Sequence, residues 1–182
     1  MRRHVFYYEP LPTPFAQAAE ALAHDPASWL PAPANPLGVG VTGNGTADRA
    51  TEEAWEVDLC AYGALPSPIA QRRAIVRVGP VPEHFAETGL DAPLGSELLR
   101  PLRWEAAVAE DLFPVLTADL ELAPLHGEGC QLSLMGSYRP PLSVVGEATD
   151  RVLGHRVAEA TVRRFVLDVV RRLTHAEAAV RH

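Results

Sequence analysis

Three polar side chains in the last third of the chain could take part in chemistry: Tyr138, Arg139 and His155. His155 lies about one helical turn after Val152, near the apolar face of the helix predicted in this region. Because the pKa of histidine lies near neutrality, an imidazole there could act as an acid or base on a bound carbonyl compound. It could equally hydrogen-bond a strand carbonyl or reach solvent, and the spacing leaves these alternatives open.

Tyr138 and Arg139 end a predicted strand, directly before Pro140 and Pro141. An arginine at the mouth of a pocket could hold an anionic group, but we favour a solvated loop arginine here. For Tyr138 we likewise favour a structural role over a catalytic one. Carboxylate pairs would be another source of chemistry, but the acidic residues alternate with apolar positions and are therefore predicted to face outward: Glu56, Asp58, Asp119 and Glu121.

No cofactor or metal site is predicted. Residues 38–43 read Gly-Val-Gly-Val-Thr-Gly, which begins like a dinucleotide fingerprint but lacks the following helix and the parallel unit. The sequence holds no nucleophile elbow, Walker loop or zinc pattern, and His84 and His126 lack ligand spacing. We therefore expect neither a cofactor nor a metal ion.

The composition excludes several classes of partner. The formal net charge is −7, which opposes binding to nucleic acid or to anionic lipid. No apolar run approaches the ~18 residues of a membrane span, so no membrane insertion is expected. The apolar stretch 5–8 is too short for a signal-peptide core, and the two cysteines, Cys60 and Cys130, form no disulfide framework. We expect a cytoplasmic protein with free, buried thiols.

The hydrophobic pattern predicts a first strand, a helical excursion and then a series of strands. The excursion comprises a helix at 15–24, with Thr13 as N-cap and Pro14 at its first position, and a short helical turn at Trp29. An irregular insertion is predicted at 80–100. The strands are expected at 4–9, 38–45, 53–62, 72–78, 102–108, 114–122 and 130–138.

A long helix is predicted at 143–173, with Ser143 as its N-cap and 175–182 as a frayed tail. The diproline before it fixes φ and forbids further strand pairing, so the chain can leave the sheet at a defined angle. Gly136 would let the last strand bend or let the helix approach closely.

This order of elements resembles the helix-grip fold of the SRPBCC superfamily, also called START-like or Bet v 1-like. The best local resemblance runs from Phe113 to Leu173, where "LFPVLTADLELAPL", "CQLSLMGSYRPP" and "DRVLGHRVAEATVRRFVLDVVRRL" are similar to the closing hairpin and terminal helix of small bacterial members. The resemblance to this superfamily implies one α+β domain over 1–182, in which a strongly curved antiparallel sheet of about seven strands wraps around the C-terminal helix.

The resemblance also implies a deep, mostly apolar cavity between sheet and helix that holds lipids, polyketides, hormones or similar molecules. Core packing is the alternative role for each lining candidate, and the polar ones are Tyr138, Arg139 and His155. The apolar candidates are Trp55, Leu59, Val76, Trp104, Leu120, Leu134, Val152, Val162 and Phe165.

Two functions follow from such a cavity. The first is binding or transport of a small hydrophobic molecule, and we favour this non-catalytic binder. The second is a polyketide cyclase or aromatase, in which His155 and Tyr138 would assist cyclisation or dehydration of a bound polyketide-type substrate. Homodimers are common among such domains, and the sequence leaves open whether this chain forms one.

Overall fold

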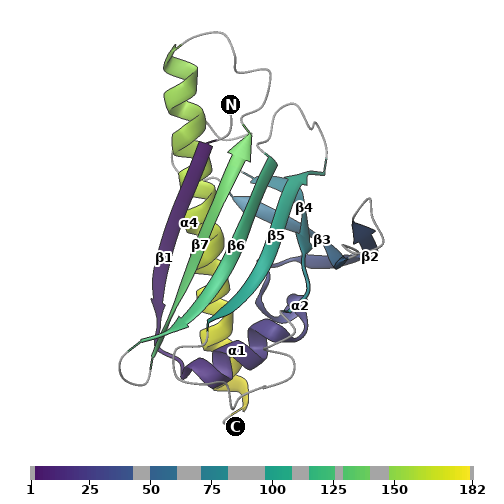
Figure 1. The fold of residues 1–182 in the computed structure, drawn as a ribbon, viewed down its shortest axis with the longest axis vertical. Coiled ribbons are helices and arrows are strands. Elements are labelled where there is room, and N and C mark those ends of the chain that lie inside the picture. Colours follow the sequence, from purple (N-terminus) through teal and green to yellow (C-terminus); the bar gives the residue numbers. More distant parts are fainter. Residues whose placement is uncertain are drawn as a thin grey trace.

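The computed structural model describes residues 3–42, 50–60, 71–81, 97–107, 115–125, 129–139 and 148–180. Its strands form one antiparallel sheet of seven strands in the order β1-β7-β6-β5-β4-β3-β2. The long helix α4 packs against this sheet, and the short helices α1 and α2 lie at one end (Figure 1). The strands are β1 (Arg3–Leu11), β2 (Ala34–Thr42), β3 (Ala50–Cys60), β4 (Gln71–Val78), β5 (Leu98–Ala106), β6 (Val115–Pro124) and β7 (Cys130–Arg139).

Period-two alternation predicted the two faces of the strands. On β4, Ala74, Val76 and Val78 are fully buried, whereas Arg73, which directly precedes them, is exposed. The same alternation buries Trp55, Val57 and Leu59 on β3 and the even-numbered residues 116–122 on β6. The sheet therefore has one apolar inner face, which packs against α4, and one outer face that is mostly polar but also exposes Phe6, Tyr8 and Met135.

The helical excursion has the predicted order, but its capping differs from the prediction. In α1 (Phe15–Ala23) the N-cap is Pro14, and no side chain caps the helix, so the prediction of Thr13 as N-cap was wrong. Thr13 is instead buried, and its backbone carbonyl accepts a hydrogen bond from the Cys130 thiol at 3.3 Å. The side-chain cap belongs to α2 (Pro26–Trp29), where the Asp25 carboxylate accepts from the Ala27 amide at 2.9 Å.

Strand β5 begins earlier than predicted. The sequence predicts an irregular insertion over 80–100, whereas residues 98–100 belong to β5. In the structure Pro101 pairs with Asp119 of β6 within β5, and its carbonyl accepts from the Gly79 amide at 2.8 Å. Arg100 thereby becomes an inward-facing strand residue. Residues 82–96 of the predicted insertion lie outside the described residues.

Helix α4 spans Ala148–Val180. It continues past the predicted end at Leu173, because residues 175–180 include three alanines and a glutamate, which favour helix. Val162, Phe165, Val169 and Leu173 are buried, as the three-and-four spacing predicted, and Ala158, Thr161 and Val166 are buried beside them. The diproline and Ser143 lie outside the described residues.

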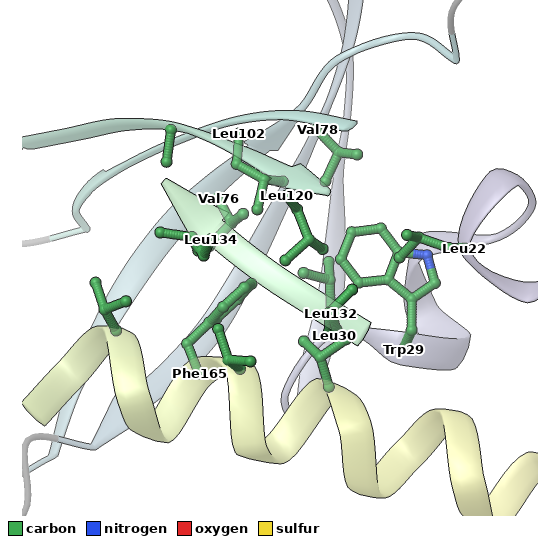
Figure 2. Packing of buried hydrophobic residues seen from close by; sticks show 14 of the residues in the cluster. Leu22, Trp29, Leu30, Val76, Val78, Leu102, Leu120, Leu132, Leu134 and Phe165 are labelled. Atoms are coloured by element: carbon green, nitrogen blue, oxygen red, sulfur yellow. The ribbon is translucent and has the colours of Figure 1, made fainter. Parts of the chain in front are cut away.

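The core lies between the inner face of the sheet, α4 and the two short helices. Figure 2 shows Phe165 rising from α4 toward Val76, Leu120 and Leu134 of the sheet, with Trp29 closing one end beside Leu22. Within the described residues, no helix is both long enough and apolar enough to cross a membrane.

Candidate functional site

A single cross-strand row on the inner face brings together four of the residues predicted to line a cavity. The strand register pairs Trp55 with Val76, Val76 with Trp104, Trp104 with Leu116, and Leu116 with Tyr138. All five side chains are buried. Two indoles, a phenol and two aliphatic groups therefore form one band across five strands, from β3 to β7.

The other predicted lining residues extend this band in two directions. From α4, the Phe165 ring lies 5.2 Å from the Trp104 ring, centroid to centroid, at an interplanar angle of 54°. Leu120 and Leu134 pair with each other in a neighbouring row. Leu59 and Val162 are buried in the same core cluster. The sheet and α4 thus converge on one apolar interior.

Three predicted site residues stand apart from this group. Arg139 follows Tyr138 along β7 and therefore faces the opposite side of the sheet, where it is exposed. Val152 and His155 lie on the first turns of α4, but their side chains are outside the described residues. Of the two candidate catalytic residues, the structure therefore places only Tyr138 in the interior.

Trp55 carries a polar atom that the interior does not satisfy. Its side chain is 8% exposed, and its indole N–H is buried without a hydrogen-bond partner. A buried donor left without a partner costs roughly 1–3 kcal/mol. The indole N–H of Trp29, in α2 at the end of the core, is likewise buried and unpartnered.

Arg100 is a buried cation that sequence reasoning missed. It is 3% exposed, and its Nη1 donates to the Ala23 carbonyl at the end of α1 over 3.1 Å, while its Nε has no partner. Burial lowers the pKa of the guanidinium, and the nearby Glu53 carboxylate partly offsets this effect. The sequence pattern that could have revealed Arg100 is the alternation of Leu98, Arg100, Leu102 and Trp104. This pattern places Arg100 on the inner face, but only if the strand is taken to begin before Pro101.

A surface groove of about 530 Å³ runs along the junction of β1 and α4. Aromatic side chains of β1 face arginines of α4 across it, and the Arg163 guanidinium lies 5.9 Å from the centroid of the Tyr7 ring. The Tyr7 hydroxyl donates to the Glu9 carboxylate at 2.8 Å, and burial raises the pKa of Tyr7. The lining residues are Phe6, Tyr7, Arg156, Glu159, Ala160, Arg163, Arg164 and Leu167. None of them belonged to the predicted site.

Metal chemistry has no geometric support in the described part of the chain. No group of three or more His, Cys, Asp or Glu side chains within it could hold a metal ion. Cys130 is buried as a free thiol, and burial raises its pKa to about 11. This thiol is therefore protonated, and unreactive as a ligand, near neutral pH.

No protein-family model matches the chain, and no curated protein matches it in sequence. Solved structures do match over nearly the whole length. The Zhui aromatase/cyclase of Streptomyces sp. R1128 has a TM-score of 0.56 at 16% identity, covering 99% of this chain and 96% of that one. The chain has the helix-grip fold. The predicted resemblance to the SRPBCC superfamily, START-like or Bet v 1-like, is thus confirmed in its architecture.

Two further structures agree with this helix-grip assignment. A protein of Thermus thermophilus has a TM-score of 0.53 at 14% identity, covering 96% of this chain and 99% of that one. A conserved protein of Geobacillus kaustophilus has a TM-score of 0.52 at 12% identity, covering 98% and 96%. At these identities the likeness concerns the fold, and function has to be argued from the site.

Proposed function

We propose that the protein binds a small hydrophobic molecule between the sheet and α4, with a hydrogen-bond acceptor of that molecule facing the indole N–H of Trp55. The molecule would lie along the cross-strand band, beside Trp55 and Trp104, and against Phe165 of α4. A ketone, ester or hydroxyl on an otherwise apolar skeleton has the required chemistry, because one end is apolar and one group accepts a hydrogen bond.

The observation that supports this proposal is the unpartnered N–H of Trp55. Buried polar groups in native proteins nearly always have a hydrogen-bond partner, so an orphaned donor in the interior calls for an explanation. A bound molecule with an acceptor satisfies this donor and recovers its desolvation penalty. Apart from the Tyr138 hydroxyl, the neighbouring side chains of the band are apolar. This apolar lining fits a ligand with a hydrophobic skeleton.

We propose binding without catalysis. A cyclase would need convergent acid and base groups around the reacting carbons. Among the predicted catalytic residues only Tyr138 lies in the described interior, and the likeness to an aromatase/cyclase is one of fold.

The test compares two fluorescent probes of similar size. Prodan carries a ketone that accepts hydrogen bonds, whereas N-phenylnaphthylamine has no carbonyl. Titration of both into the wild type and Trp55→Phe should show prodan binding weakened about five- to tenfold in the variant, which is the loss of one hydrogen bond of about 1–1.5 kcal/mol. Binding of N-phenylnaphthylamine should change less than about twofold, since the apolar band is retained.

Trp29→Phe is the matched control, because it removes another buried, unpartnered indole N–H that lies outside the band. It should leave the affinity for both probes unchanged. Equal loss of prodan binding in both variants, or none in Trp55→Phe, would refute the assignment of Trp55. Failure of both probes to bind the wild type would refute the hydrophobic site itself.

A further inference from the structure

The outer face of the sheet carries a second, smaller hollow at the ends of three adjacent strands. Its volume is about 240 Å³, below the ~300–1,000 Å³ typical of pockets for drug-sized ligands. The lining residues are Arg103 of β5, Val115 and Thr117 of β6, and Ser137, Tyr138 and Arg139 of β7. It lies on the other side of the sheet from the apolar interior and is independent of the function proposed above.

The strand register explains why these side chains meet. Arg103 pairs with Thr117, and Thr117 pairs with Ser137, so the three lie in one row across β5, β6 and β7. Arg139 pairs with Val115 in the next outward-facing row. The strands that carry the two arginines flank β6 and are separated by two strand spacings, or about 10 Å. Arg103 and Arg139 therefore lie on the two strands that flank β6, at the edge of the same hollow.

The charges around the hollow favour an anion. Glu105 is shared between Arg103, at 3.3 Å, and Arg77, at 3.1 Å, so one carboxylate faces two guanidinium groups. Within the described part of the chain, Arg139 makes no ion pair. The next acidic residue on the outer face of β6, Asp119, is not part of the lining. The hollow is thus locally cationic in a chain whose net charge is −7.

The donors differ in kind and direction. The lining offers two guanidinium groups, one from β5 and one from β7, and the hydroxyls of Thr117 on β6 and Ser137 on β7. A carboxylate presents two oxygens in one plane, whereas a phosphate group presents three or four around a tetrahedral centre and matches arginine forks well. We propose that this hollow binds a phosphate group, either free in solution or as the headgroup of a phospholipid.

The first experiment uses inorganic phosphate as the probe. Amide NMR spectra are recorded during a phosphate titration and during a chloride titration at equal ionic strength. Saturable, phosphate-specific shifts are expected at residues 103, 117, 137 and 139, with a dissociation constant on the order of 1 mM for so open a site. Arg139→Gln should raise that constant at least about tenfold, and Thr117→Val should raise it a few-fold.

Arg73→Gln is the matched control. Arg73 is also an exposed arginine on the outer face, but it pairs with Glu56 on β3 at 3.4 Å and lies outside the hollow. This variant should bind phosphate like the wild type. Because Arg139 is exposed, Arg139→Gln should retain the melting temperature, which separates lost binding from lost folding.

The second experiment distinguishes the two sources of the phosphate group. Flotation is carried out with phosphatidylcholine vesicles, with and without phosphatidic acid. Binding to the acidic vesicles that disappears in Arg139→Gln identifies a lipid headgroup, whereas phosphate-specific shifts without vesicle binding identify a soluble source. The proposal is overturned if neither probe binds, or if Arg139→Gln and Arg73→Gln behave alike.

Discussion

Gly136 allows β6 and β7 to approach each other closely. A Cβ atom at this position would lie 2.5 Å from the Cβ of Ala118 and 2.7 Å from the Thr117 carbonyl oxygen. Both contacts are shorter than packed atoms tolerate, and the second involves backbone that moves only with the strand. The sequence predicted a bend or a close approach by the helix at Gly136, and the close approach proves to be to the neighbouring strand.

We therefore expect Gly136→Ala to lower the free energy of unfolding by about 1–3 kcal/mol, the usual cost of forcing extra volume into a packed site. Gly40→Ala on β2 is the control, because a Cβ there meets nothing within 4 Å. Urea denaturation measures both variants. Equal effects of the two substitutions would show that the cost reflects strand propensity rather than the contact with Ala118.

Cys130 makes the stability of the protein depend on pH in the alkaline range. Burial raises the pKa of its thiol from 9.0 to about 11. Below the lower value the thiol is protonated in both the folded and the unfolded state. Between the two values the unfolded state loses the proton first, so the free energy of unfolding falls as the pH rises.

Cys130→Ala should remove this contribution and make the decline between pH about 9 and 11 shallower. Chemical denaturation of the wild type and the variant at several pH values gives the two slopes to be compared. Their difference is the relevant quantity, because the substitution also changes the stability at every pH. Identical slopes would mean that the thiol ionises as easily in the folded as in the unfolded protein.

At the scale of elements, Arg100 connects β5 to the C-terminal end of α1. Its guanidinium donates to the Ala23 carbonyl, one of the helix-end carbonyls that have no partner within the helix. Arg172 of α4 makes a similar contact with the Ala27 carbonyl of α2 at 3.3 Å, but its side chain is only partly buried. The two short helices are thus held to the sheet on one side and to α4 on the other.

Arg100→Ala is expected to lower the free energy of unfolding by about 1–3 kcal/mol, since it removes buried packing and leaves the partly buried Ala23 carbonyl without its donor. Arg172→Ala should cost less than about 1 kcal/mol, because solvent can replace its hydrogen bond. Thermal or urea unfolding gives the comparison. A larger loss for Arg172→Ala would show that the α4 contact, not the β5 contact, holds these helices.

The packing of α4 on the sheet depends on Phe165. Truncation to alanine in Phe165→Ala should cost about 3–5 kcal/mol, because it removes a fully buried ring and its contact with Trp104. Leu167→Ala, on the half-buried groove side of the same helix, should cost about 1 kcal/mol or less. Similar losses in both variants, measured by urea denaturation, would contradict the assignment of the buried stripe.

Elements with a regular pattern could be predicted from the sequence, whereas their irregular ends could not. The faces of β3, β4 and β6 follow from period two, and the buried stripe of α4 follows from its three-and-four spacing. The start of β5 was missed because the prolines and glycines before it predicted an irregular insertion up to residue 100, and Arg100 was missed with it. The extension of α4 beyond Leu173 was missed because the apolar pattern fades there while helix propensity stays high.

At the scale of the whole molecule, the fold was predictable and its function only in outline. The order of the elements was enough to predict the helix grip, since a long helix can cover one apolar sheet face. The chemistry of the site depends on whether single polar atoms have hydrogen-bond partners. The Trp55 N–H has none, and no pattern in the sequence predicts this. The outer-face hollow likewise depends on strand register, which only the folded sheet shows.

The central claim is that a hydrophobic molecule lies in the interior with its acceptor facing Trp55. The chain has three tryptophans, so the indole N–H region of its ¹H–¹⁵N NMR spectrum contains three cross-peaks, which Trp→Phe variants assign. On titration with prodan, the Trp55 cross-peak should move downfield and saturate as the ketone accepts its proton, while the Trp29 cross-peak stays in place. A Trp55 cross-peak that does not move, with shifts confined to residues of the β1–α4 groove, would contradict the claim.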